Sequence, residues 1–240
     1  MKKLFVLGFL LIVATAFTAG VTLFESDRPV FIPPSPQRLG GDPKKGFDYL
    51  VTGDYVKGGI PLNFFLLGIG KNKNNWLHRE GVNSKISHEF TAVTATNGEV
   101  LVAPNCMQCH AQVFEDSLYV GMGNSFADFT KFSGANMQLL EKILKTTAPR
   151  KYEAAENFIT VGKAIGPYLA TEVRGVNAAD RLAGVLAAHR DPVTFKWNAT
   201  PQLPIPKEVI ATDVPAWWLL KKKNAMFYNG FGRGDFGRFL

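Results

Sequence analysis

The pattern of apolar and polar positions changes several times along the chain. Residues 4–24 form an uncharged, largely apolar run that follows Lys2 and Lys3. Residues 25–89 hold many Pro and Gly turn formers and no sustained helical or strand period, so we expect a long irregular segment that wraps over a core. β-Forming residues on both sides of Asn97-Gly98 predict a hairpin over residues 90–103, with a type I′ turn.

Helical periodicity dominates beyond residue 110. Apolar residues recur there at three- and four-residue spacing, which predicts amphipathic helices near residues 135–146, from about 151 to Gly166-Pro167, and over 177–190. Asn177 is a candidate cap for the last of these helices, and the C-terminal tail, residues 201–240, is loop-like. We therefore predict a mainly α fold, with a helical domain over residues 90–240, the irregular segment before it and one short β-hairpin.

Residues 1–24 have the composition of an export signal or an N-terminal membrane anchor. Two lysines precede the apolar run, and Ala14-Thr15-Ala16 is a small-x-small cleavage site. A run of about 20 apolar residues is also long enough to span a bilayer. Cleavage and retention both stay open, and both place the rest of the chain in the periplasm or cell envelope, either soluble or membrane-associated through residues 4–24.

Composition narrows the function classes. The formal net charge is +7, but the basic residues are not gathered with aromatic residues, so we expect no nucleic-acid partner. Two cysteines can close at most one bridge, which excludes a disulfide-dense scaffold.

The two cysteines belong to one motif, Cys106-Met107-Gln108-Cys109-His110. C-x-x-C-H is the pattern of covalent haem attachment, in which two thiols form thioethers with the haem vinyl groups and the adjacent histidine binds the iron. We expect haem c on Cys106 and Cys109, with His110 as the iron ligand. Haem is attached on the exported side of the membrane, so the apolar N-terminal run supports this interpretation independently.

Two other interpretations fit the cysteines less well. A redox-active dithiol is expected at a helix start in a βαβ context, and no parallel-strand pattern surrounds this motif. A structural zinc site needs a second pair of cysteines or histidines.

The second axial ligand of the iron decides between electron transfer and ligand chemistry. Core packing is the alternative role for His189 and Met137, because each lies on an apolar helical stripe. None of the candidates is preferred; they are His189, Met226, Met122, Met137 and a residue beyond 240.

The tail combines Trp217-Trp218 with Lys221-Lys222-Lys223. The tryptophans could line a haem face or form a buried pair. The lysines could form a docking edge for a redox partner with an acidic surface, or a solvated face.

Together, Cys106–His110 and residues 214–230 resemble the di-haem cytochrome c peroxidase superfamily, which includes the methylamine-utilisation haem enzymes. The matching order in the tail is Val-Pro, aromatic residues, then aromatic-x-x-Gly. The resemblance implies an exported, cytochrome c-like haem domain of helices in which electrons pass between two haems.

The chain departs from that family in three respects. It has one C-x-x-C-H, it carries Tyr228 and Asn229 where the family commonly has a histidine and an acid, and it stops shortly after this element. We therefore expect the N-terminal part of a longer chain whose second haem motif lies beyond Leu240. The predicted function is one-electron transfer by one covalent haem, and the alternative is a peroxidase-like enzyme.

Overall fold

The computed structural model describes residues 30–71, 74–130, 136–205, 207–209, 211–226, 230 and 232–238. Two compact units make up the chain: a larger one over residues 40–221, and a smaller one built from its two ends, residues 1–39 and 222–240. The predicted export signal or anchor lies outside the described residues. Within them, no helix is long and apolar enough to cross a membrane.

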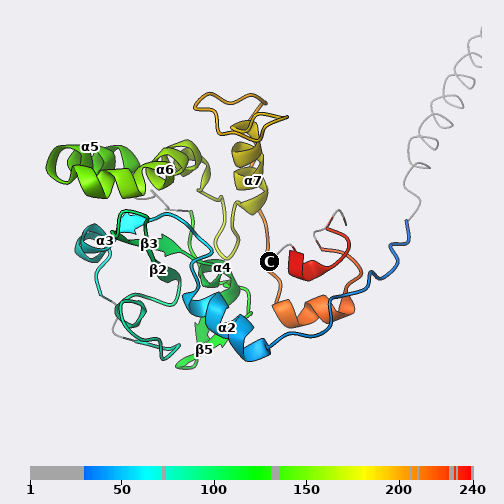
Figure 1. Ribbon diagram of the computed structural model, residues 1–240. Helices are drawn as coiled ribbons and strands as arrows, with labels where there is room; N and C mark the ends of the chain where they lie inside the picture. Colours follow the sequence, from blue (N-terminus) through cyan, green and yellow to red (C-terminus); the bar gives the residue numbers. More distant parts are fainter. Residues whose placement is uncertain are drawn as a thin grey trace, which may run out of the picture. The chain divides into compact units, whose positions relative to one another are not determined.

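The fold is mixed α/β, and the prediction of a mainly α, cytochrome c-like fold is wrong. The structure is 37% helical and 13% strand, with two small antiparallel sheets. The sheets arise from short β-forming stretches on both sides of the cysteine motif, one of which the helical interpretation of the sequence overlooked. Figure 1 follows the order of the elements along the chain.

The first sheet has the strand order β1-β3-β2, built from Ile60–Pro61, Val100–Pro104 and Phe90–Thr94. Its β2–β3 hairpin confirms the predicted one, with Thr94 paired with Val100. The turn differs from the expected type I′, because Gly98 alone is left-handed, at φ +84°, and its N–H donates to the Ala95 carbonyl. A three-residue loop with one left-handed glycine joins the strands instead.

The segment before this hairpin is less irregular than expected. Helix α2 spans Pro43–Thr52, and the Asp42 carboxylate accepts from the N–H groups of Lys44 and Lys45 at its start. Helix α3 spans Leu62–Gly68, and a 3₁₀ turn, η1, spans Asn83–Lys85. Asp42 is thus an N-cap, and Pro43 occupies the first helical position.

The second sheet is a hairpin directly after the cysteine motif. Strands β4, Ala111–Phe114, and β5, Ser117–Val120, are joined by Glu115 and Asp116, at φ +44° and +55°. Two consecutive left-handed residues are what a type I′ turn requires. The expectation of helical structure immediately after the cysteines is wrong at this point.

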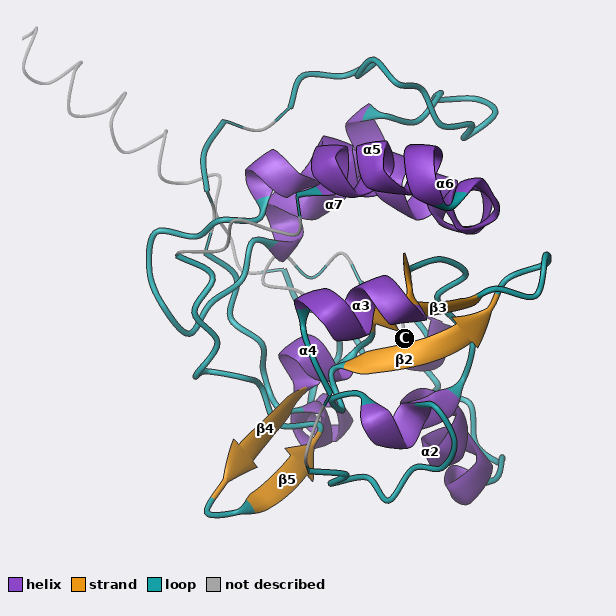
Figure 2. Cartoon of the chain, turned by 90° about the vertical axis from the view of Figure 1, so that its left-hand side faces the viewer, coloured by secondary structure: helices purple, strands orange, loops and turns teal. Residues whose placement is uncertain are grey.

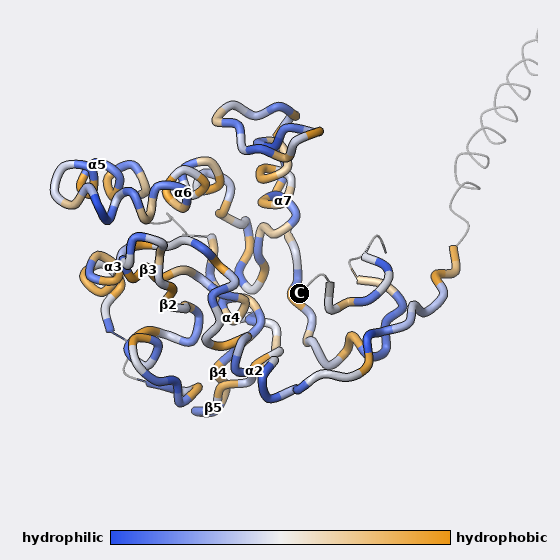
Figure 3. Tube along the Cα trace, in the orientation of Figure 1, coloured by the Kyte–Doolittle hydropathy of each residue, from blue (hydrophilic) through white to orange (hydrophobic). Residues whose placement is uncertain are grey.

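The helices predicted in the second half are confirmed with small changes of boundary. They are α5 over Met137–Thr147, α6 over Pro149–Ile165 and α7 over Ala179–Ala188, with a 3₁₀ turn, η2, over Gly166–Tyr168. Ala178, not the expected Asn177, is the N-cap of α7; Asn177 lies one residue earlier, where its side-chain oxygen accepts from the Ala179 N–H. Hydrophobic and hydrophilic residues alternate along α5 and α6, as in amphipathic helices (Figure 3).

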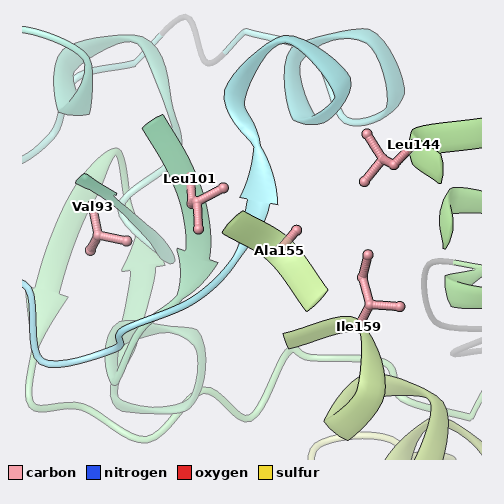
Figure 4. Packing of buried hydrophobic residues seen from close by; sticks show 5 residues of the cluster. All are labelled: Val93, Leu101, Leu144, Ala155 and Ile159. Carbon is pink, nitrogen blue, oxygen red and sulfur yellow. The ribbon is translucent and has the colours of Figure 1, made fainter. Parts of the chain in front are cut away.

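The hairpin β2–β3 has a core on each face. Val93 and Leu101 are paired across the strands and pack with α5 and α6 through Leu144, Ala155 and Ile159 (Figure 4). The neighbouring cross-strand pair, Ala92 and Val102, faces the other way and packs with Phe65 of α3 and with Ile86. Alternation of side chains along the strands therefore separates two hydrophobic clusters. Figure 2 shows these strands, with the short helix α4 at the end of β3.

The smaller unit ties the two chain ends together. The Gln37 side chain donates to the Gly234 carbonyl and accepts from the Phe236 N–H, and the Asn224 side chain donates to the Ile32 carbonyl. Arg38 pairs with Asp235 at 3.5 Å. Two 3₁₀ helices complete the tail, η3 over Trp217–Lys222 and η4 over Phe236–Arg238.

Candidate functional site

The cysteine motif forms a single helical turn between the two hairpins. Strand β3 ends at Pro104, and α4 spans Met107–His110 with Cys106 at its N-cap. The Cys106 carbonyl accepts from the N–H groups of Cys109, at 3.3 Å, and His110, at 2.9 Å. The turn thus fixes the backbone of both cysteines and of the histidine relative to one another.

Asn105 anchors this turn to the first hairpin. Its side-chain oxygen accepts from the Met107 N–H at 2.9 Å, and its amide donates to the His88 carbonyl and the Thr91 hydroxyl. Met107 is fully buried. These contacts make α4 a rigid continuation of β3, although the turn is too short to be stable on its own.

Both thiols are free and partly exposed. Burial raises the pKa of the Cys109 thiol above its usual value, and the nearby Cys106 and Glu89 raise it further by smaller amounts. Tyr55 lies beside Cys106. Burial, and to a smaller extent the Cys106 thiol, raises the pKa of Tyr55 to about 12. The Cys109 thiol and the phenol are therefore protonated at neutral pH.

His110 is half-buried, and burial lowers its pKa, so the imidazole is neutral at pH 7. Its Nδ1 is buried without a hydrogen-bond partner in the described part of the chain. The ring is stacked on Trp217, with centroids 4.7 Å apart and planes inclined by 28°. A neutral imidazole is the form that binds a metal ion.

The loop after β5 encloses the motif from the other side. The His110 carbonyl accepts from the Gly121 N–H at 2.7 Å, and the Cys109 carbonyl accepts from the Asn124 N–H at 2.9 Å. The Asn124 side chain also donates to the Gln108 carbonyl. The carbonyls at the end of this helical turn are thereby satisfied by backbone and amide donors.

The structure separates the candidates for the second axial ligand. His189 is 5% exposed, its Nδ1 lies 2.8 Å from the Asn198 carbonyl, and its ring stacks on Trp197. Met137 packs against Gly162 on α6. Both residues thus have the core-packing roles that the sequence left open.

Met122 and Met226 differ in their relation to His110. Met122 is partly buried and directly follows Gly121, so the structure brings it next to the motif. Met226 pairs with Gly232 in the smaller unit, whereas His110 belongs to the larger unit.

Three features of the site were not foreseen from sequence. They are the Asn105 anchor, the contact of Trp217 with His110, and a buried arginine, Arg79, behind the first hairpin. Pro-Asn before the motif is a turn signal that could have indicated the anchor. The Trp217 contact joins distant parts of the chain, and Arg79 stands in a polar stretch without any pattern.

The donor set fits haem c better than a bare metal ion. Among the described residues, no three His, Cys, Asp or Glu side chains gather as a metal cluster. The motif instead offers two free thiols and one neutral imidazole on a single turn, which are the groups that covalent haem attachment uses. Lys221, Lys222 and Lys223 are all exposed.

Comparison of the chain with family profiles, with curated proteins and with solved structures finds no match.

Proposed function

We propose that the chain is an exported electron-transfer protein that holds one haem through thioethers at Cys106 and Cys109, with His110 as an iron ligand. The observation that carries the proposal is the geometry of the motif. Two free thiols and a neutral, half-buried imidazole share one rigid turn that is anchored on both sides.

Haem bound at this turn supplies a reversible one-electron couple. The chain contributes position and environment. Asn105 and the loop after β5 hold the backbone of the motif, and Trp217 holds the imidazole ring. Because α4 is hydrogen-bonded on both sides, its backbone is held in place, which would favour rapid electron exchange at a haem bound there.

The arrangement argues against a dithiol–disulfide catalyst. Such catalysts place the reactive cysteine at the start of a helix that follows a strand of a parallel sheet, and they lower thiol pKa values. Here the motif stands between antiparallel hairpins, α4 has a single turn, and the pKa of Cys109 is raised.

Covalent haem content tests the proposal directly. The chain is matured in a host that exports it and attaches haem, and is then assayed by intact mass and by the pyridine haemochrome spectrum. We expect one haem per chain, a single thioether in Cys106→Ala or Cys109→Ala, and no covalent haem in the double variant. Gln108→Ala is the matched control, because that position lies between the cysteines and supplies no thiol.

A mass without added haem in the unaltered chain would overturn the proposal. The optical spectrum then separates electron transfer from peroxidase chemistry. A low-spin reduced spectrum that does not change on addition of peroxide supports the carrier. A high-spin ferric spectrum that changes with peroxide contradicts it, because that iron has an open position.

A further inference from the structure

Trp217 lies against His110 although the two residues are far apart in the chain. Their ring centroids are 4.7 Å apart and their planes are inclined by 28°, which is a stacked contact. Its neighbour Trp218 is 50% exposed and makes no ring contact within the described part of the chain. Of the two adjacent tryptophans, only the first therefore belongs to the site.

Two close backbone approaches bring Trp217 to the motif. The segment Val214–Trp217, here called the strap, lies on the loop after β5, where the Trp217 N–H donates to the Gly121 carbonyl at 2.8 Å. Gly121 in turn donates to the His110 carbonyl at 2.7 Å. A Cβ at Gly123 would overlap the Val214 carbonyl, so glycine at this position allows the strap to approach.

Stacking replaces the hydrogen bond that usually orients a metal-binding histidine. Such histidines commonly donate their second ring N–H to a carboxylate, a carbonyl or water. Nδ1 of His110 is buried and has no partner among the described residues, and neither has the buried Nε1 of Trp217. Contact with the indole is thus the interaction that restrains the plane of the imidazole.

We propose that Trp217 is a positioning residue for His110: its indole fixes the imidazole plane and keeps water from Nδ1. The link to the iron rests on the proposed function, whereas the stack is a property of the chain itself. A hydrogen bond at the second ring nitrogen makes a ligating imidazole more basic. Because Trp217 keeps water from Nδ1, that hydrogen bond does not form. The His110 imidazole would then be a weaker electron donor to the iron, and the reduction potential of the haem would be higher.

The haem-free protein tests the positioning role without reference to the iron. Protons on the His110 ring that lie over an indole experience its ring current, which NMR of histidine-labelled protein detects. We expect Trp217→Ala to abolish this shift, Trp217→Phe to retain part of it, and Trp218→Ala to leave it unchanged. Unchanged His110 signals in Trp217→Ala would overturn the proposal.

The haem-loaded protein tests the consequence for the iron. In Trp217→Ala water reaches Nδ1, so we expect a lower midpoint potential than in the unaltered protein. The potential of Trp217→Phe should stay closer to the unaltered value, because the phenyl ring still excludes water from Nδ1 of His110. Trp218→Ala is the matched control and should not move the potential. A fully loaded Trp217→Ala protein with an unaltered potential would contradict the proposed effect on the iron.

The outcomes separate this inference from the proposed function. Lack of covalent haem in the unaltered chain overturns the proposed function, and the NMR comparison still decides whether Trp217 positions His110. If Trp217→Ala fails to fold, Gly123→Ala provides a second route, because its methyl group displaces the strap. It should also abolish the ring-current shift, whereas Gly68→Ala, which meets nothing within 4 Å, should not. Retention of the shift in Gly123→Ala would count against the strap.

Discussion

Arg79 carries a positive charge into the interior without a carboxylate partner in the described part of the chain. Its side chain is 5% exposed. The guanidinium donates to four backbone carbonyls, those of Val51, Ile86, Ser87 and Phe90, at 2.8–3.2 Å. Burial lowers its pKa to about 10, so it stays charged at neutral pH. One side chain thus joins the end of α2 to the hairpin that delivers the cysteine motif.

Replacing Arg79 should destabilise the larger unit, because four buried carbonyls accept hydrogen bonds from its guanidinium. The planar guanidinium of arginine can donate to four carbonyls at once, whereas the compact ammonium group of lysine cannot reach all of them. We expect Arg79→Lys to cost about 1–3 kcal/mol and Arg79→Met more, because buried acceptors lose their donors. Unfolding in urea measures the difference. Arg174→Lys, at a 70% exposed side chain, is the control and should change stability by less than about 0.5 kcal/mol.

Single residues show what the sequence can and cannot indicate. The stripe that holds His189 predicts a buried face, and the structure confirms burial while giving the imidazole a backbone partner. The C-x-x-C-H motif predicts haem attachment from sequence alone, because its residues are close together in the chain and need no tertiary contact to be recognised. The stack of His110 on Trp217 could not be predicted, because it depends on contacts between segments that are distant in the chain.

At the scale of elements, turn chemistry was the least predictable feature. Asn97-Gly98 predicts a type I′ turn, but packing of β2 and β3 admits a longer loop with one left-handed residue. Glu115-Asp116 forms a two-residue left-handed turn that its composition does not suggest. The register of β4 and β5, with Phe114 paired with Ser117, leaves only these two residues to form the turn.

The long helices were predictable because their apolar spacing persists over three turns or more. The short helix α3 was not, since its seven residues after Pro61 carry too little periodic signal. The prediction of a mainly α, cytochrome c-like fold failed for a different reason. The helices after the motif are present, but the strands β1, β4 and β5 were not expected, because each has four residues or fewer.

Helices α5 and α6 are linked by a charged group that should make their pairing depend on pH. Glu141 accepts hydrogen bonds from Lys163 of α6 and Lys145 of α5, which lowers its pKa to about 2. Because the folded-state pKa lies below the usual 4.5, the pair stabilises the fold above about pH 4.5 and loses that contribution as the pH falls toward 2.

A pH series of unfolding free energies on Glu141→Gln tests this dependence. At pH 7 we expect the variant to be less stable by about 1 kcal/mol or less, since partly exposed ion pairs are screened by solvent. The difference should vanish near pH 2. Glu153→Gln, at an exposed position of α6, should show no such convergence. A constant difference across the series would argue against the Glu141 ion pairs.

At the scale of the whole molecule, the chain ends form a unit of their own. Residues 30–39 and 222–238 are held together by Gln37, Asn224 and the Arg38–Asp235 pair. The larger unit contains both hydrophobic clusters and the complete cysteine motif with its strap. Among the described residues, both clusters are therefore made only of residues within 40–221.

A chain limited to residues 40–221, placed behind a separate export signal, should keep its fold and, under the proposed function, should attach haem as the full chain does. Circular dichroism and cooperative urea unfolding measure the fold, and the pyridine haemochrome spectrum measures attachment. We expect haem loading equal to that of the full chain. The full chain with Gln37→Ala is the companion variant, since it should weaken only the smaller unit. Non-cooperative unfolding of residues 40–221 would show that the two units depend on each other.

The strap also sets an order of events during biogenesis. Trp217 follows His110 by roughly a hundred residues, so in a chain exported from its N-terminus the cysteine motif emerges well before its aromatic neighbour. During that interval His110 lacks its cover, and the first hairpin and α4 can already form from local contacts. In the proposed function, an attachment enzyme would therefore meet an open motif, which the strap would cover later. The separation of the two rings in sequence would then leave time for haem attachment before His110 is covered.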